Sequence, residues 1–163
     1  MDLAQARQLA DDLMRLHKLS PNWSFKFDHS KVAFGKCYYG KKQISLSRHL
    51  VELNEENEVR DTILHEIAHA LAPRGSAHNA KWQAIAKSIG CNGDRCYGSE
   101  VVRPAPKFKG TCPACNLVIY RHRRTMVACA ICSPVFDKRY AFVWSQTHSN
   151  SRTNRKVATK EKR

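Results

Sequence analysis

Residues 62–71 read TILHEIAHAL and contain the pattern His-Glu-x-x-His. In an α-helix, residues four apart lie about 40° apart around the axis and one turn above each other. His65 and His69 therefore share one face of the predicted helix, where they can bind one metal ion together. Glu66 projects beside them, so its carboxylate can act as a general base without binding the metal.

A zinc ion held by two histidines needs a third protein ligand while one position stays open for water. His78 is the favoured third ligand, because the turn at Pro73 and Gly75 reverses the chain and brings the next helix back along the first. Glu100 is the alternative, since a carboxylate from a later segment can complete such a site. It follows the break at Gly98, however, and no helical pattern surrounds it.

Such a site supports hydrolysis of a peptide bond. Zinc lowers the pKa of a bound water molecule from about 16 to about 7, so that hydroxide forms near neutral pH. We expect this zinc-bound water to be the nucleophile and Glu66 to accept its proton as the general base. We also expect an exposed edge of the strand at residues 43–47 to hold an extended substrate by backbone pairing.

The elements around the motif predict an α+β fold. Helices and strands are expected at residues 3–18, 23–28, 32–39, 43–47, 55–72 and 77–89. The helices show apolar residues at steps of three and four, and the strands show apolar or alternating runs. Asn54 is the expected N-cap of the helix that carries the motif.

Two CxxC pairs follow in the C-terminal part of the chain, Cys112 with Cys115 and Cys129 with Cys132, and 13 residues separate them. Four thiolates in this pattern close a tetrahedral structural zinc site, which is a better explanation than a redox dithiol. The interval at residues 117–124 is expected to form the hairpin of a zinc ribbon. A module of this size needs the metal to fold.

Three further cysteines belong to neither pair. Cys37 is expected to be a buried strand residue. Cys91 and Cys96 are also expected to be buried thiols, because their spacing has no partner pair.

Basic residues concentrate in the C-terminal part of the chain, whose formal net charge is +14. Residues 1–100 carry 14 basic and 12 acidic side chains, whereas residues 101–163 carry 14 basic and 2 acidic ones. This asymmetry is typical of a segment that binds a polyanion, because each Lys or Arg that meets a phosphate releases counterions. A solvated basic tail is the plainer alternative.

A run of five residues on the predicted hairpin interleaves an aromatic ring with cations, and it consists of Tyr120, Arg121, His122, Arg123 and Arg124. Bases can stack on the tyrosine while the arginines hold the phosphates. The run therefore predicts sequence-independent binding to single-stranded or junction-containing DNA, with ordinary solvated charge as the alternative.

The composition predicts three segments, namely a core at residues 1–102, a linker with the four-cysteine module at 103–144, and a basic tail at 145–163 that we expect to be disordered. No segment approaches the roughly 20 apolar residues that span a bilayer, and no secretion signal precedes the core. We therefore expect a monomer in the cytoplasm, associated with the nucleoid and without a membrane partner.

These motifs resemble the SprT-like zinc metalloproteases, whose eukaryotic members include Spartan. The resemblance rests on ISLS at residues 44–47, on the run at 62–71, on SAH at 76–78 with Trp82, and on the cysteine module at 112–132. It implies a zincin-like metalloprotease core followed by a C-terminal zinc ribbon. The 163 residues leave no room for the long tails of the eukaryotic members, so we expect a minimal bacterial or phage-type member, which would act in the host cytoplasm if phage-encoded.

The resemblance also implies the roles of the site residues. His65, His69 and His78 would bind the catalytic zinc and Glu66 would be the catalytic base, so that the chain would bind two Zn²⁺ ions with the one in the ribbon. Characterised members of the family degrade proteins crosslinked to DNA and are activated by DNA. The implied activity is a DNA-activated endopeptidase that acts on DNA-bound or DNA-crosslinked proteins.

Two other functions remain open at this point. A nucleic-acid-binding protein that uses the zincin fold only as a scaffold would bind DNA in a salt-dependent way without proteolysis. A small-peptide zinc hydrolase with an incidental basic tail would cleave peptides regardless of DNA.

Overall fold

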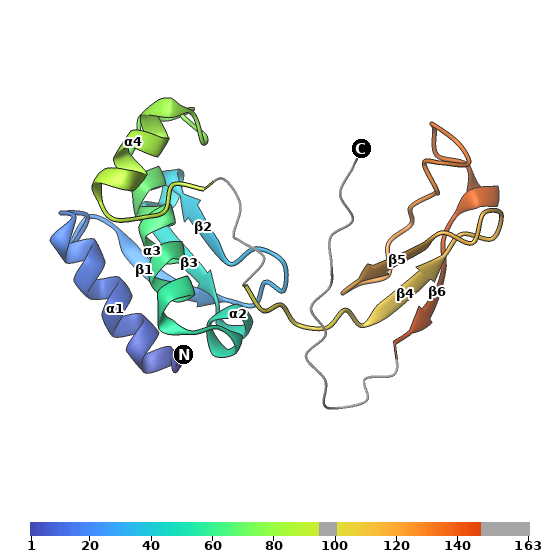
Figure 1. Cartoon of the computed structure of the whole chain (residues 1–163), viewed down its shortest axis with the longest axis horizontal. Helices are drawn as coiled ribbons and strands as arrows, with labels where there is room; N and C mark the ends of the chain where they lie inside the picture. The colour runs from blue at the N-terminus through green and yellow to red at the C-terminus, as the bar shows by residue number, and fades with distance from the viewer. Residues whose placement is uncertain (95–100, 148–163) are drawn as a thin grey trace. The chain divides into compact units, whose positions relative to one another are not determined.

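The structure is a computed structural model that describes residues 1–94 and 101–147. The chain divides into two compact units, Met1–Pro104 and Ala105–Arg163 (Figure 1). The predicted α+β class is confirmed, because the first unit combines helices with a three-stranded sheet. The rival ligand Glu100, the thiol of Cys96 and the predicted basic tail from residue 148 onward lie outside the described residues.

The sheet of the first unit has the strand order β1-β3-β2. Strand β1 (Ser24–Asp28) runs parallel to β3 (Gln43–Ser47), and β2 (Gly35–Tyr38) runs antiparallel to it. Strand β3 is therefore central, and its residues 44–47 are buried on both faces. The prediction that this strand offers a free edge to a substrate is wrong, because both of its edges pair with neighbouring strands.

Within the described residues of this unit, helices α1 (Leu3–Leu16), α2 (Arg48–Leu53) and α3 (Glu56–Leu71) pack on the sheet, and helix α4 (Ala80–Ser88) packs on α3. Helix α3 contacts α1, α4 and strands β2 and β3, so the helix that carries the histidines lies at the centre of the unit (Figure 1). Its apolar residues Val59, Ile63 and Ile67 are fully buried. No helix within the described ranges is long and apolar enough to cross a bilayer.

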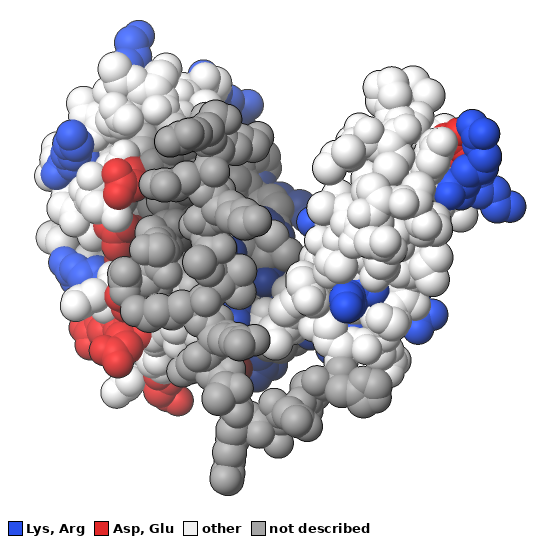
Figure 2. Space-filling view, turned by 45° about the vertical axis from the view of Figure 1, so that its right-hand side comes forward, with Lys and Arg blue, Asp and Glu red and all other residues white. Residues whose placement is uncertain are grey.

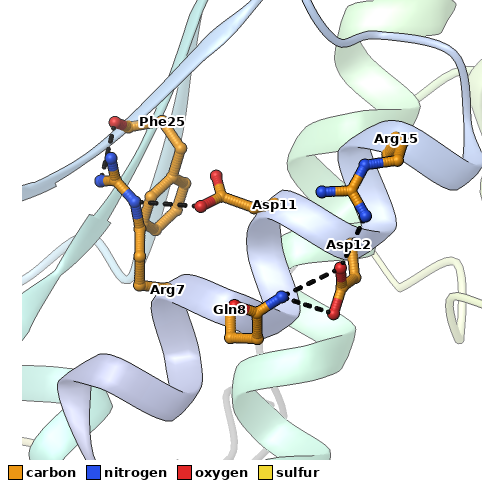
Figure 3. Close-up of polar contacts among 6 residues, drawn as sticks. All are labelled: Arg7, Gln8, Asp11, Asp12, Arg15 and Phe25. Carbon is orange, nitrogen blue, oxygen red and sulfur yellow. Dashed lines mark hydrogen bonds and ion pairs between the residues drawn. The ribbon is translucent and has the colours of Figure 1, made fainter.

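Polar side chains contact one another along α1, and Arg7 also joins this helix to strand β1 (Figure 3). The Arg7 guanidinium donates to the carbonyl oxygen of Phe25 at 3.1 Å and lies 5.4 Å from the centroid of the same residue's ring. It also pairs with Asp11 at 3.2 Å, and Gln8 donates to Asp12 at 3.0 Å. Exposed ion pairs contribute little to stability, so the contact with the strand is the important one.

Asn54 is not the N-cap of α3, which begins at Glu56 and has Glu55 at the cap position without a side-chain cap bond. The Asn54 amide group instead donates to the carbonyl oxygens of Leu50 and Val102, at 2.7 and 2.8 Å. It also accepts a hydrogen bond from the backbone N–H of Val102 at 2.7 Å. The N-cap prediction is wrong because the Asn54 side chain bonds to α2 and to Val102, near the end of the first unit, and not to the first turn of α3.

The second unit contains a sheet in which β4 (Phe108–Thr111) lies between β5 (Val118–Arg121) and β6 (Val143–Gln146), antiparallel to both. The hairpin joins β4 to β5 around the first CxxC pair. The prediction of a hairpin within residues 117–124 is therefore wrong, because the strand that pairs with β5 comes before the cysteines.

Strand β6 also extends two residues into the segment for which we expected disorder. Ser145 and Gln146 pair with Lys109 and Phe108 of β4, and the Thr147 N–H donates to the carbonyl oxygen of Lys107 at 2.9 Å. Backbone pairing orders these residues although their side chains are polar.

Candidate metal centres and active site

Helix α3 carries the first two histidines and the glutamate next to strand β2. His65 and Glu66 are buried, with exposed fractions of 6% and 4%, and His69 is half-buried. These polar groups face strand β2 and the loop that follows α3, since all of them line one cavity with residues of these segments.

The ring nitrogens of His65, His69 and His78 converge on one point. The three Nε2 to Nε2 distances are 3.2 Å between His65 and His69, 3.1 Å between His65 and His78, and 3.1 Å between His69 and His78. A tetrahedral zinc ion with Zn–N bonds of 2.0–2.1 Å holds its nitrogen ligands about 3.3 Å apart. The three imidazoles therefore fit one such ion, and the described residues of this group supply three ligands and not four.

His78 reaches the cluster from the loop between α3 and α4. Ala77 before it has a φ of 44°, in the left-handed region. Asn79 after it is the N-cap of α4, and its side chain accepts hydrogen bonds from the N–H groups of Lys81 and Trp82 at 3.0 and 3.2 Å. The loop that presents His78 is thus fixed on both sides.

Trp82 packs against all three imidazoles. Its ring centroid lies 4.7 Å from that of His65, 5.1 Å from that of His69 and 4.6 Å from that of His78. The side chain is fully buried, and the indole Nε1 has no hydrogen-bond partner among the described residues. Trp82 forms an apolar back wall that holds the rings in place and keeps water from that side.

Burial keeps two of the imidazoles neutral. It lowers the pKa of His65 to about 3, with smaller contributions from the charges that His69 and His78 would carry. It likewise lowers the pKa of His69 to about 4, helped by His78. A neutral imidazole is the form that binds a metal ion, so the histidines are prepared for this role at neutral pH.

A cavity of about 570 Å³ opens at the histidines and Glu66. It is lined by Gly35, Lys36, Cys37, Tyr39, His65, Glu66, His69, Gly75, Ala77 and His78. A substrate can therefore reach the carboxylate and the three ring nitrogens from the same side.

The wall of this cavity opposite α3 comes from β2 and the residue after it. Gly35, Cys37 and Tyr39 alternate along this segment and line the cavity. Burial and then the Glu66 charge raise the pKa of Cys37 to about 12. Burial and the charges of Cys37 and Glu66 also raise the pKa of Tyr39.

Sequence reasoning missed the part that these three residues play. Cys37 is half-buried at the cavity wall rather than buried in the strand as expected, whereas Cys91 is buried as expected. The alternation of Gly35, Cys37 and Tyr39 was the available signal. This alternation indicates a cavity wall only when β2 is known to face Glu66.

The four paired cysteines form the second candidate centre. Their sulfur atoms all lie within 4.8 Å of one another, with Cys112 and Cys132 3.8 Å apart and Cys115 and Cys129 3.6 Å apart. Zinc–sulfur bonds of 2.3 Å in a tetrahedron give sulfur distances of about 3.8 Å. The cluster therefore fits a zinc ribbon.

Hydrogen bonding favours a thiolate at one of these positions. The backbone N–H of Cys115, followed by that of Ala114, lowers the pKa of Cys112 to about 7. Hydrogen bonding with the neighbouring Cys115 thiol instead raises the pKa of Cys132 to about 12. A thiolate is the form that binds zinc, so the backbone N–H groups prepare Cys112 for this role.

The structure does not place the run of five residues from Tyr120 to Arg124 entirely on a hairpin. Tyr120 and Arg121 belong to β5, and the other three follow in a loop. The Tyr120 side chain is 54% exposed, and Arg121 and Arg123 are exposed as well. The Arg124 guanidinium lies 5.1 Å from the centroid of the Phe108 ring.

Positive charge dominates this unit. Residues 105–147 include seven Lys and Arg and one acidic residue, Asp137. Lys and Arg also outnumber acidic residues on the face of this unit seen in Figure 2. The fold and both candidate centres together define an α+β protein with one three-histidine and one four-cysteine group that could each hold a metal ion.

Comparison with known proteins gives the family. The model of the SprT-like family matches residues 3–102. Protein SprT of Pseudomonas aeruginosa (strain UCBPP-PA14) is 30% identical over 118 residues, which cover 66% of this chain and 70% of that protein. Protein SprT of Pseudomonas putida (strain W619) is 30% identical over 100 residues, which cover 57% of this chain and 60% of that protein. The chain belongs to the SprT-like family.

Proposed function

We propose that the chain is a zinc-dependent endopeptidase with a zincin-like core, and that DNA activates it toward DNA-bound or DNA-crosslinked proteins. The observation that carries the proposal is the convergence of three imidazole nitrogens within 3.2 Å beside a buried carboxylate, in an open cavity. Membership of the SprT-like family supports a function related to metalloproteases.

His65, His69 and His78 would hold the catalytic zinc. When bound, zinc would act as a Lewis acid on the scissile carbonyl group and on water. Glu66 would accept a proton on its carboxylate oxygen from the attacking water and later return it to the nitrogen of the leaving amine. Its place in the cavity that the three histidines also line supports this role, because a general base must lie close enough to the water to form a hydrogen bond with it.

Strand β2 is the better candidate for holding an extended substrate. Among the described residues it pairs with β3 on one edge and with no strand on the other. Its residues Gly35, Lys36 and Cys37 line the cavity next to Glu66. A peptide that added to this edge as a further strand would run past the carboxylate.

The second unit would bind DNA without reading its sequence. The exposed Tyr120 ring offers a stacking surface, and Arg121, Arg123 and Arg124 offer charges for phosphates. A second zinc ion would be held by Cys112, Cys115, Cys129 and Cys132. As part of the same proposal, the protein would be a monomer in the cytoplasm and would associate with the nucleoid.

The test is cleavage of a protein crosslinked to a single-stranded oligonucleotide by the full chain and by Glu66→Gln. The wild type should cleave, and the variant should lose activity by at least about 10³-fold, because an amide cannot accept the proton. Equal cleavage by both proteins would refute the role of Glu66.

The DNA dependence has its own test. Free single-stranded DNA should accelerate cleavage of an uncrosslinked DNA-binding protein, and replacing Arg121, Arg123 and Arg124 with Ala should weaken DNA binding and reduce its salt dependence. Salt-dependent DNA binding without cleavage in any condition would instead support the scaffold function.

A further inference from the structure

Gly35 is the residue of β2 that approaches Glu66 most closely. A Cβ atom at this position would lie 2.6 Å from Oε1, 2.7 Å from Cγ and 2.9 Å from Cδ of Glu66. Side-chain carbons in proteins do not come this close to other heavy atoms. The glutamate therefore occupies the volume that any other amino acid at position 35 would need.

Neither backbone can easily move to make room. Gly35 pairs with Leu46 of the central strand, which is fully buried, and the carbonyl oxygen of the neighbouring Phe34 accepts a hydrogen bond from the Ser47 N–H at 2.7 Å. Phe34 itself is fully buried. On the other side, Glu66 belongs to α3, whose apolar face is locked into the core.

The Glu66 carboxylate is the group that can move, because it lines the open cavity. An added methyl group at position 35 would therefore displace the carboxylate rather than the strand or the helix.

We infer that Gly35 is a positioning residue, which sets the place of the Glu66 carboxylate by leaving it the space of an absent side chain. The expected effect of Gly35 on catalysis rests on the proposed function, in which Glu66 is the general base. Gly35 does not touch the reacting atoms itself. It lets the acidic side chain of α3 lie directly against the strand that would hold the substrate.

The test compares Gly35→Ala with Gly40→Ala in the full zinc-loaded chain. Neither glycine has a positive φ, and a Cβ at the exposed Gly40, in the 3-10 turn Tyr39–Lys41, meets nothing within 4 Å, so the control adds the same methyl group without the contact. Gly35→Ala should lower kcat/KM for the crosslinked substrate by about 10- to 100-fold, as expected for a catalytic group displaced by about 1 Å. Its zinc content should equal that of the control.

A second measurement ties the effect to Glu66 and needs no activity. Gly35→Ala should lower the urea midpoint of unfolding in the wild-type background, and the loss should fall to less than about half in the Glu66→Ala background, where the clash is absent. Should Gly35→Ala fail to fold, the double variant with Glu66→Ala should fold again.

Three results would overturn the inference. They are activity of Gly35→Ala equal to that of Gly40→Ala, equal losses of stability in both backgrounds, and a double variant that stays unfolded. A chain that cleaves nothing while the unfolding data still couple Gly35 to Glu66 would refute the proposed function and leave the contact in place.

Discussion

Ala77 has a strained backbone conformation directly before the metal-ligand candidate His78. A residue with a side chain is strained in the left-handed region, and Ala77 lies there with a φ of 44° directly before His78. Asn79, directly after the ligand, stabilises the start of α4, because its side chain caps this helix.

We predict that Ala77→Gly raises the free energy of unfolding by about 0.5–1 kcal/mol, because glycine adopts this conformation without strain. Urea unfolding measures the change. The control is Ala84→Gly at an exposed position of α4, which should lower the same free energy by about 1 kcal/mol. A loss of stability in Ala77→Gly would contradict this explanation.

Trp82 is a second single residue with a local effect, because its ring packs against all three histidines. We predict that Trp82→Phe weakens zinc binding at the three-histidine site about tenfold, because the smaller ring no longer supports all three imidazoles. A competition titration with a chelating dye measures the affinity. Ile63→Val removes buried volume from α3 away from the histidines and should leave the affinity unchanged; equal effects of the two substitutions would point to general destabilisation.

At the scale of the elements, Asn54 joins α2 to the segment at Val102 near the end of the first unit. We predict that Asn54→Ala lowers the free energy of unfolding by about 2–3 kcal/mol, because the backbone groups of Val102 and Leu50 lose their buried partner. The exposed Asn57 on α3 provides the control, and Asn57→Ala should change stability by less than about 0.5 kcal/mol. Similar losses in the two variants would argue against the tie.

The sequence predicts local features of the elements well. The spacing of His65 and His69 follows from helix periodicity, and both CxxC pairs follow from spacing alone. His78 could be anticipated because a short turn reverses the chain after α3.

Strand order could not be predicted in the same way. It depends on which segments pair over long distances, so the central place of β3 was hidden. The role of Gly35 was hidden too, because a glycine carries no chemical group and matters only through the side chain that faces it. Trp82 was visible as an apolar helix residue, but its contact with the imidazoles depends on how α4 packs on α3.

For the whole molecule, the two units should respond differently to loss of metal. The buried core of the second unit consists of Cys112, Cys129 and Phe142 among the described residues, whereas the first unit has an extensive apolar core. We predict that a strong zinc chelator unfolds residues 105–147 and leaves the first unit folded, because so small a core cannot fold without its ion.

Amide signals in NMR spectra of the full chain measure this difference. Signals of the second unit should lose their dispersion after chelation, and Cys129→Ser should have the same effect in the presence of zinc. Unchanged dispersion in the second unit without metal would show that its fold does not need the four-cysteine site.

The most direct test of the three-histidine centre is the zinc content of the purified full chain, determined by elemental analysis. The wild type and Glu66→Gln should each contain about two zinc ions per chain, and His78→Ala should retain about one, in the four-cysteine site. Two ions in His78→Ala, or a single ion in the wild type, would contradict a zinc centre built from these three imidazoles.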